Sequence, residues 1–108
     1  MSHDYVMVLT TLPVDADGAG FAQSLVEERL AACVNLLAPM ESVYRWEGTI
    51  EQETERQVVI KTSKDRVSML WDRIRELHPY DVPEILAFTV EEGSAAYLEW
   101  LRASTVDK

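Results

Sequence analysis

The stretch Val43–Ser63, VYRWEGTIEQETERQVVIKTS, decides how the rest of the chain is interpreted. It predicts two strands joined by a tight turn at Trp46–Thr49, because Gly48 can supply the positive φ angle that such a turn needs. Side chains alternate along a strand, so Tyr44 and Trp46 are expected to share one face. This stretch therefore predicts a β-hairpin.

The outgoing strand of this hairpin is polar near its tip and apolar at its base. Ile50 is followed by a polar run over 51–57 and only then by the apolar residues 58–60. A strand with this pattern cannot be buried along its whole length within its own domain, so we expect it to project as an arm. Because the arm has unpaired edges, it requires a partner chain. We therefore expect an oligomer.

Length and composition indicate one globular domain, residues 1–108, with 47% hydrophobic and 27% charged residues. The net charge of −9, from 19 acidic and 10 basic residues, opposes binding to nucleic acid and to anionic membranes. There is no secretory signal pattern and no apolar run near the roughly 18 residues that a membrane span needs. The one cysteine fits a reducing compartment. We therefore expect a cytoplasmic protein.

The first half of the chain predicts two strands and a helix before the hairpin. The apolar run Tyr5–Leu9 is typical of a central strand that is buried on both faces. A helix should follow, with Asp15 or Asp17 as its N-cap. Cys33–Leu37 should form the second strand, interrupted at Pro39 before it continues into the hairpin.

The second half predicts two helices around one more strand. Ser63 suits the N-cap of a helix that Pro79 would end. Ile85–Val90 is typical of another buried strand, and Ser94 should cap a short third helix. The apolar stripe of the second helix comprises Val67, Leu70, Trp71, Ile74, Leu77 and His78.

The predicted order of elements defines the fold class. It is an α+β, ferredoxin-like βαββαβ arrangement with an added C-terminal helix. The sheet should be antiparallel, with both main helices on one face. This fold carries many functions, so the function must be argued from side chains.

The segment His78–Glu84, HPYDVPE, holds the richest set of reactive groups. It combines an imidazole, a phenol and two carboxylates on a backbone held by two prolines. Imidazole and carboxylate groups suit copper or zinc, and they also suit acid–base chemistry. A structural interpretation competes, because His78 continues the apolar stripe and could interact as a cation with the C-terminus of the helix.

Three other features have simple interpretations. Cys33 lies in a predicted core strand and is more simply a small buried hydrophobe than a metal ligand. Glu51, Glu53 and Glu55 share a strand face and would repel one another unless paired with cations, although a solvated hairpin tip is the simpler explanation. The N-terminal amine, two amides and the His3 imidazole could wrap a copper ion, which would confound copper experiments.

Four segments taken together resemble the CutA family of divalent-cation tolerance proteins. The resemblance spans nearly the whole chain, in the right order and at the right spacings. It implies a ferredoxin-like protomer, related to PII-type signalling proteins, in a homotrimer whose neighbouring hairpins pair. The segments are Leu30–Asn35 (LAACVN), Tyr44–Ile50 (YRWEGTI), Ile60–Thr62 (IKT) and His78–Ile85 (HPYDVPEI).

The resemblance also implies an association with copper and other divalent ions, no established catalysis, and ligand sites in clefts between subunits. Some family members have a cysteine where this chain has Thr10, and some have a histidine where it has Leu77. The residues implied by the resemblance are His78 and Glu84 as metal ligands, Trp46, Glu53, Lys61 and Tyr80 in the cleft, and Tyr44, Trp46 and Ile50 in the trimer arm.

These observations lead to three functional hypotheses. The first is a non-catalytic homotrimer that binds copper or another divalent cation at subunit clefts. The second is a PII-like sensor or scaffold, in which an organic anion binds in the clefts through Lys61. The third is an enzyme that uses His78, Tyr80 and Glu84 as acid–base groups, but the chain has no phosphate loop and no nucleophile motif. We therefore expect a binding protein.

Overall fold

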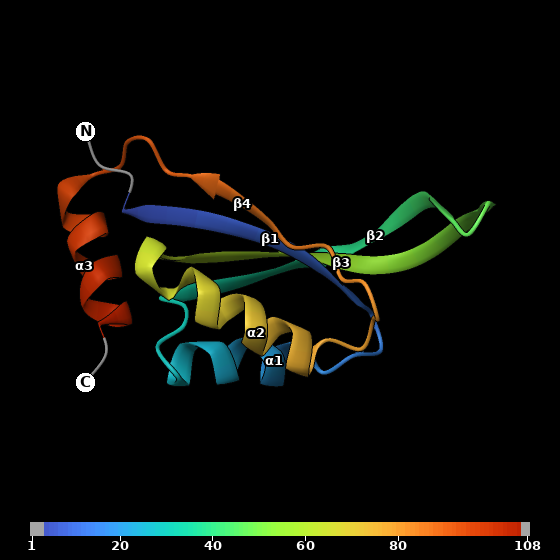
Figure 1. The fold of residues 1–108 in the computed structure, drawn as a ribbon, viewed down its shortest axis with the longest axis horizontal. Helices are drawn as coiled ribbons and strands as arrows, with labels where there is room; N and C mark the ends of the chain where they lie inside the picture. The colour runs from blue at the N-terminus through green and yellow to red at the C-terminus, as the bar shows by residue number, and fades with distance from the viewer. Residues whose placement is uncertain (1–3, 107–108) are drawn as a thin grey trace.

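The computed structural model of the protein describes residues 4–106. Its elements occur in the predicted β-α-β-β-α-β order, followed by a third helix (Figure 1). They are β1 (Tyr5–Pro13), α1 (Gly18–Glu27), β2 (Cys33–Trp46), β3 (Thr49–Ser63), the 3₁₀ turn η1 (Lys64–Arg66), α2 (Val67–Leu77), β4 (Leu86–Thr89) and α3 (Ala95–Thr105).

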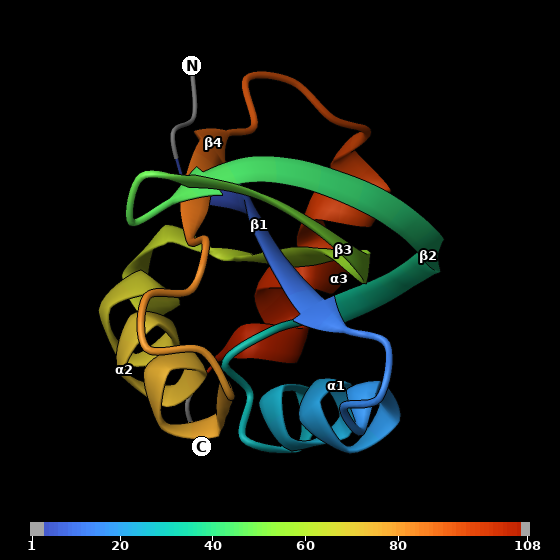
Figure 2. The same cartoon turned by 90° about the vertical axis from the view of Figure 1, so that its right-hand side faces the viewer.

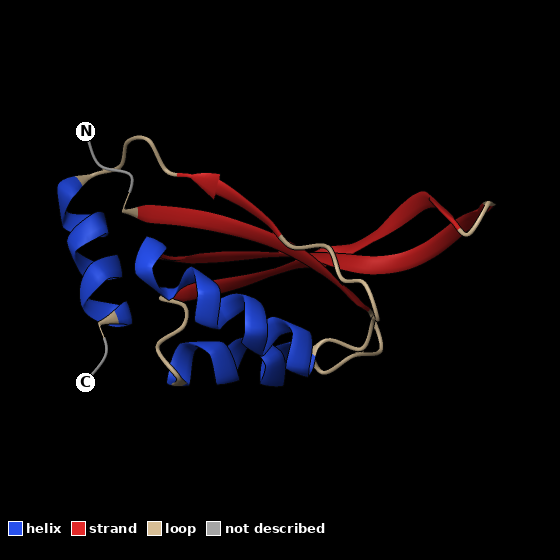
Figure 3. Ribbon diagram, viewed as in Figure 1, coloured by secondary structure: helices blue, strands red, loops and turns tan. Residues whose placement is uncertain are grey.

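The four strands form one antiparallel sheet in the order β2-β3-β1-β4. Helices α1 and α2 lie side by side on one face of this sheet, as Figures 2 and 3 show. This confirms a mixed α+β fold with an antiparallel sheet. The core between the two layers comprises Val6, Val8, Leu12, Phe21, Leu25, Val58, Ile60, Leu70 and Ile74.

Strand β1 lies in the middle of the sheet but is not buried on both faces, so that prediction was wrong. Val6 and Val8 face the helices and are buried, whereas Tyr5 and Met7, which alternate with them, are only half-buried. The reason is that both main helices pack on the same face. Within one protomer, α3 reaches only the end of the other face, where Arg102 lies over the Tyr5 ring, and α1 and α2 do not cover that face.

Strand β4 also contradicts the prediction of a buried strand. Leu86 and Phe88 are 51% and 47% exposed. They pair with Leu9 and Met7, respectively, which places them on the face of the sheet opposite α1 and α2. We refer to this surface as the open sheet face; its apolar residues are Met7, Leu9, Val59, Leu86 and Phe88.

The hairpin of β2 and β3 forms the predicted projecting arm. Its two-residue turn has φ angles of 50° at Glu47 and 81° at Gly48, as a type I′ turn requires. Strand β1 ends at Pro13, opposite Glu55, so the outer part of the hairpin consists of β2 and β3 alone (Figure 1). Both edges of the arm are therefore unpaired within the protomer.

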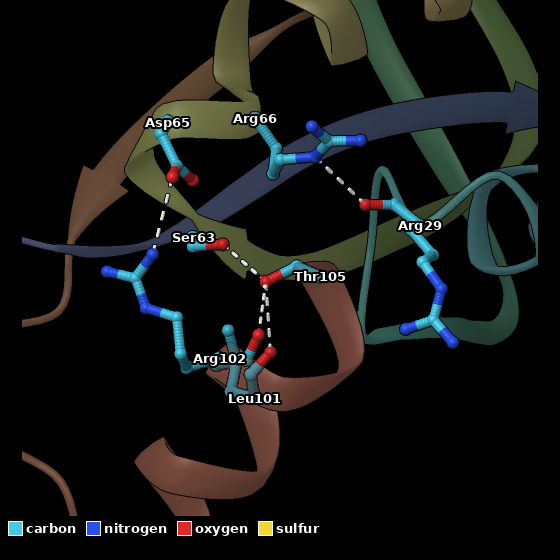
Figure 4. A network of polar contacts seen from close by, with 7 residues as sticks. All are labelled: Arg29, Ser63, Asp65, Arg66, Leu101, Arg102 and Thr105. Carbon is cyan, nitrogen blue, oxygen red and sulfur yellow. Dashed lines mark hydrogen bonds and ion pairs between the residues drawn. The ribbon is translucent and has the colours of Figure 1, made fainter. Parts of the chain in front are cut away.

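Helix α3 lies across the end of the sheet that is farthest from the hairpin tip (Figure 1). Ser94 caps it as predicted, accepting a hydrogen bond from the Tyr97 amide at 3.2 Å. Ser63 does not cap α2, because η1 intervenes between them. The Ser63 hydroxyl instead forms a buried hydrogen bond with the hydroxyl of Thr105, which anchors α3 to the end of β3 (Figure 4).

Helix α1 is capped by Asp17, one of the two predicted residues, whose carboxylate accepts a hydrogen bond from the Gly20 amide at 3.0 Å. After the helix, Arg29 adopts a left-handed conformation with φ of 60°. Its guanidinium lies 3.4 Å from a carbonyl oxygen near the end of α3, and its backbone carbonyl accepts a hydrogen bond from the Arg66 guanidinium (Figure 4).

Among residues 4–106, no helix is both long and apolar enough to cross a membrane.

Candidate functional site

A cleft of about 680 Å³ lies between the hairpin arm and the segment that connects α2 to β4. We call it the arm cleft. Its walls combine aromatic rings, carboxylates and apolar side chains. The arm contributes Met40, Ser42, Tyr44, Trp46, Glu55 and Gln57, the connecting segment contributes 79–82 and Glu84, and β1 contributes Thr11.

A register shift in β2 determines which side chains of the arm face this cleft. Leu36 pairs with Val58, which faces the core, whereas Met40 pairs with Glu55, which lines the cleft. The irregularity between Leu36 and Pro39 therefore reverses the alternation of β2. As a result, every second residue from Met40 to Trp46 faces the arm cleft.

Tyr80 joins the connecting segment to the arm. Its hydroxyl donates a hydrogen bond of 2.9 Å to the Glu55 carboxylate, which is only 7% exposed. Burial raises the pKa of Tyr80, and the bond to Glu55 raises that pKa further. Of the two interpretations of the acidic run, the solvated tip is therefore wrong for Glu55, although Glu53 is exposed.

His78 lies just beyond α2 in an extended conformation, with φ of −81° and ψ of 136°. Its Nδ1 accepts a hydrogen bond of 3.1 Å from the Tyr80 amide, so the proton must be on Nε2, which lies 2.6 Å from the Thr11 carbonyl oxygen. Burial lowers the pKa of this imidazole. His78 is therefore a neutral residue that joins three segments, and the predicted cationic role at the end of the helix was wrong.

This geometry predicts a contribution of His78 to stability that depends on pH. An unfolded histidine takes up its proton near pH 6.5, whereas the folded state resists protonation, so the unfolded chain binds more protons below about that pH. The contribution should be complete above about pH 7.5 and should decline as the pH falls towards 5, by at most about tenfold in the unfolding equilibrium constant per pH unit. Glu55 partly opposes the shift, because its charge favours the imidazolium.

Urea unfolding of the parent and of His78→Gln, at one protein concentration and at several pH values, measures this contribution. The variant should be less stable near neutral pH, and the difference between the two proteins should shrink on acidification. If the difference in the free energy of unfolding between the two proteins stays the same at every pH, the assignment of a neutral imidazole is wrong.

The metal role predicted for His78 and Glu84 is not supported within one protomer. Both His78 ring nitrogens are hydrogen-bonded. The Glu84 carboxylate accepts a hydrogen bond of 3.1 Å from the side-chain amide of Gln57. Within residues 4–106, no three side chains of His, Cys, Asp or Glu are grouped so that they could hold a metal ion. The N-terminal segment that includes His3, which was predicted to be able to bind copper, lies outside the described residues. The metal role of His78 and Glu84 therefore remains a prediction.

The structure does not bring the other predicted residues together at one place. Trp46 and Tyr80 line the arm cleft, whereas Glu53 is exposed next to it. Ile50 is exposed near the arm tip. Lys61 lies far along β3, opposite Met7 in β1, and its amine is 6.0 Å from the Tyr97 ring. The protomer therefore does not bring Lys61 into the arm cleft.

The structure also places three further positions that the sequence analysis discussed. Cys33, predicted to be buried, is only half-buried at the start of β2, and its thiol lies 3.7 Å from the Asn35 side-chain oxygen. Thr10 is fully buried, and its hydroxyl has no hydrogen-bond partner in the described part of the chain. Leu77 packs against the core at the end of α2.

Comparison with known proteins identifies the family of this chain. A sequence profile described as CutA1 divalent ion tolerance protein matches residues 6–104. The chain belongs to the CutA1 family. Among its CutA1 relatives is the divalent-cation tolerance protein CutA of Thermus thermophilus, which is 43% identical over 99 residues, covering 92% of this chain and 96% of the relative.

Solved CutA1 structures share the fold described above. The Thermus thermophilus protein superimposes with a TM-score of 0.90 at 42% identity, over 94% of this chain and 99% of that one. CutA from Synechococcus elongatus gives a TM-score of 0.91 at 39% identity, over 97% and 93% of the two chains. Human Protein CutA is 43% identical over 95 residues, but the match covers only 53% of its length.

Proposed function

We propose that this protein is a non-catalytic, homotrimeric cation-binding protein that acts in tolerance to divalent cations in the cytoplasm. The observation that carries the proposal is the arm cleft, an acid-lined cavity beside an arm whose edges are unpaired within the protomer. Membership of the CutA1 divalent ion tolerance family supports the cellular role.

Two surfaces of the protomer support assembly. The outer arm offers unpaired backbone edges that can add to a strand of a neighbour. The open sheet face is apolar and is not covered by a helical layer, and such surfaces mark sites of protein association. In the proposed trimer, which resembles PII-type assemblies, neighbouring arms pair and each arm cleft lies at a subunit boundary.

The charge of the arm cleft favours a cation. Its lining includes the carboxylates of Glu55, Asp81 and Glu84 and no lysine or arginine. The family description names a divalent ion, and we propose copper as the first candidate. Glu84 would bind it together with groups from a neighbouring subunit. His78 could join only by giving up its hydrogen bond from the Tyr80 amide.

The second candidate is a PII-like sensor or scaffold that binds an organic ligand in the same clefts. The cleft volume of about 680 Å³ favours it, because small-molecule sites commonly fall between about 300 and 1,000 Å³. The predicted organic anion lacks this support, since Lys61 lies outside the cleft.

Calorimetric titration with copper(II) and with zinc tests the metal role. The parent should carry His3→Ala, so that the N-terminal segment lacks its imidazole ligand for copper. We expect Glu84→Gln to weaken metal binding by roughly tenfold or more, and Glu41→Gln, on the opposite face of the same arm, to leave it unchanged. A trimer that takes up neither metal would contradict this role.

A further inference from the structure

We propose that the arm cleft binds a small organic ammonium ion. This inference rests on the cation-binding cleft of the proposed function and names the class of cation. It follows from three independent properties of the cleft, which are its size, its aromatic walls and its charge.

With the side chains of one protomer alone, the cleft suits an organic ligand better than a bare metal ion. A divalent ion needs several ligand atoms at about 2.0–2.6 Å, and no group of three ligating side chains occurs within residues 4–106. The volume of about 680 Å³ could instead hold an organic molecule of several heavy atoms.

The aromatic walls can recognise an ammonium group. Tyr44, Trp46 and Tyr80 all line the cleft, and the faces of such rings attract organic cations. Tyr80 is held in place on both sides, because its ring packs 4.9 Å from the His78 ring and its hydroxyl is bonded to Glu55. At least one wall of the site is therefore formed before the ligand arrives.

The charge of the cleft selects a cation over a neutral or anionic molecule. Glu55 is nearly buried, and its hydrogen-bond partner is the Tyr80 phenol rather than a cation. Asp81 is exposed and Glu84 is half-buried on the opposite wall. Arg45 and Arg56 do not neutralise these carboxylates. By the alternation of side chains along the strands, both lie on the face of the arm opposite the cleft.

The pKa of Tyr44 reflects the same negative field. Burial raises this pKa first, and the nearby carboxylates of Glu53, Glu51 and Glu55 raise it further. A positive charge placed between the Tyr44 and Tyr80 rings would therefore be stabilised both by the ring faces and by the carboxylates.

The test is a calorimetric titration of the full chain with 1,4-diaminobutane, with 1,4-butanediol as the neutral analogue and succinate as the anionic one. We expect the diamine to bind and the other two to give no signal. Raising the salt concentration from about 0.05 to 0.5 M should weaken the binding, because the screening length shortens.

Two variants locate the binding. Asp81→Asn and Glu84→Gln should each lower the affinity for the diamine by roughly tenfold. Glu41→Gln, on the opposite face of the arm, should bind the diamine like the parent. Asp81 is exposed, so its replacement leaves the fold intact and keeps the test informative. Circular dichroism confirms that each variant is folded.

Three results would overturn the inference. They are no diamine binding, succinate binding with equal or greater affinity, or diamine binding that both cleft variants leave unchanged. If the arm of a second copy fills the cleft, the first result is the one obtained. Trimers that take up copper but not the diamine would retain the proposed function and reject this inference alone.

Discussion

Replacing Trp46 with alanine should weaken the proposed trimer by about 2 kcal/mol or more per site, which is roughly a thirtyfold loss of affinity. Trp46 is the last residue of β2 and is 45% exposed in the protomer. A large aromatic side chain at the end of an arm has no core of its own chain to enter. Trp46 also lines the arm cleft, and burial of the part of its ring outside the cleft against a neighbouring subunit would make it an anchor of the interface.

Sedimentation velocity over a dilution series measures this effect, with circular dichroism as the check on folding. Met69→Ala is the matched control, because Met69 is 46% exposed but lies on α2 in the helical layer. The control should dissociate like the parent. If Trp46→Ala does the same, the placement of Trp46 in a subunit interface is wrong.

Replacing Phe88 with aspartate should dissociate the proposed trimer at micromolar protein concentrations. Phe88 lies on the open sheet face, and a carboxylate buried there without a partner would cost several kcal/mol, of the order of 3–5. Within the protomer Phe88 is 47% exposed, so the fold of the separated chain should survive the change.

Light scattering at several protein concentrations reports the mass of this variant. Met69→Asp introduces the same charge on the helical layer and should leave the assembly unchanged. A Phe88→Asp variant that remains fully assembled would mean that the open sheet face is not a subunit interface.

Local chemistry explains why the hairpin could be predicted from the sequence. The turn depends on residues next to one another, and the positive φ angle predicted at Gly48 is present, whereas the positive φ angle at Glu47 was not predicted. The interruption near Pro39 was likewise visible, and it coincides with the register shift in β2. The order of elements followed from periodicity and caps, such as those at Asp17 and Ser94.

Burial could not be predicted at the same level. The apolar runs of β1 and β4 are typical of strands covered on both faces, but the residues of β4 are exposed in the protomer. Periodicity shows that a strand is apolar, and it does not show whether its own chain or another chain covers it. Ser63 illustrates a similar limit, because its partner Thr105 is 42 residues away.

The candidate site was predicted only in part. The sequence singled out Trp46, Tyr80 and Glu84, and all three line the arm cleft. The family resemblance implied Glu53, and nothing in the alternating acids distinguished Glu55, because its partner Tyr80 is 25 residues away. The neutral state of His78 depends on Thr11, 67 residues earlier in the chain.

Native mass spectrometry of the unmodified protein at low micromolar concentration tests the central claim most directly. The proposed trimer predicts a single species with three times the mass of the 12.3-kDa chain. That result would place the arm clefts at subunit boundaries as proposed. A spectrum of monomers or dimers would contradict the account, since the unpaired arm and the open sheet face would then need another explanation.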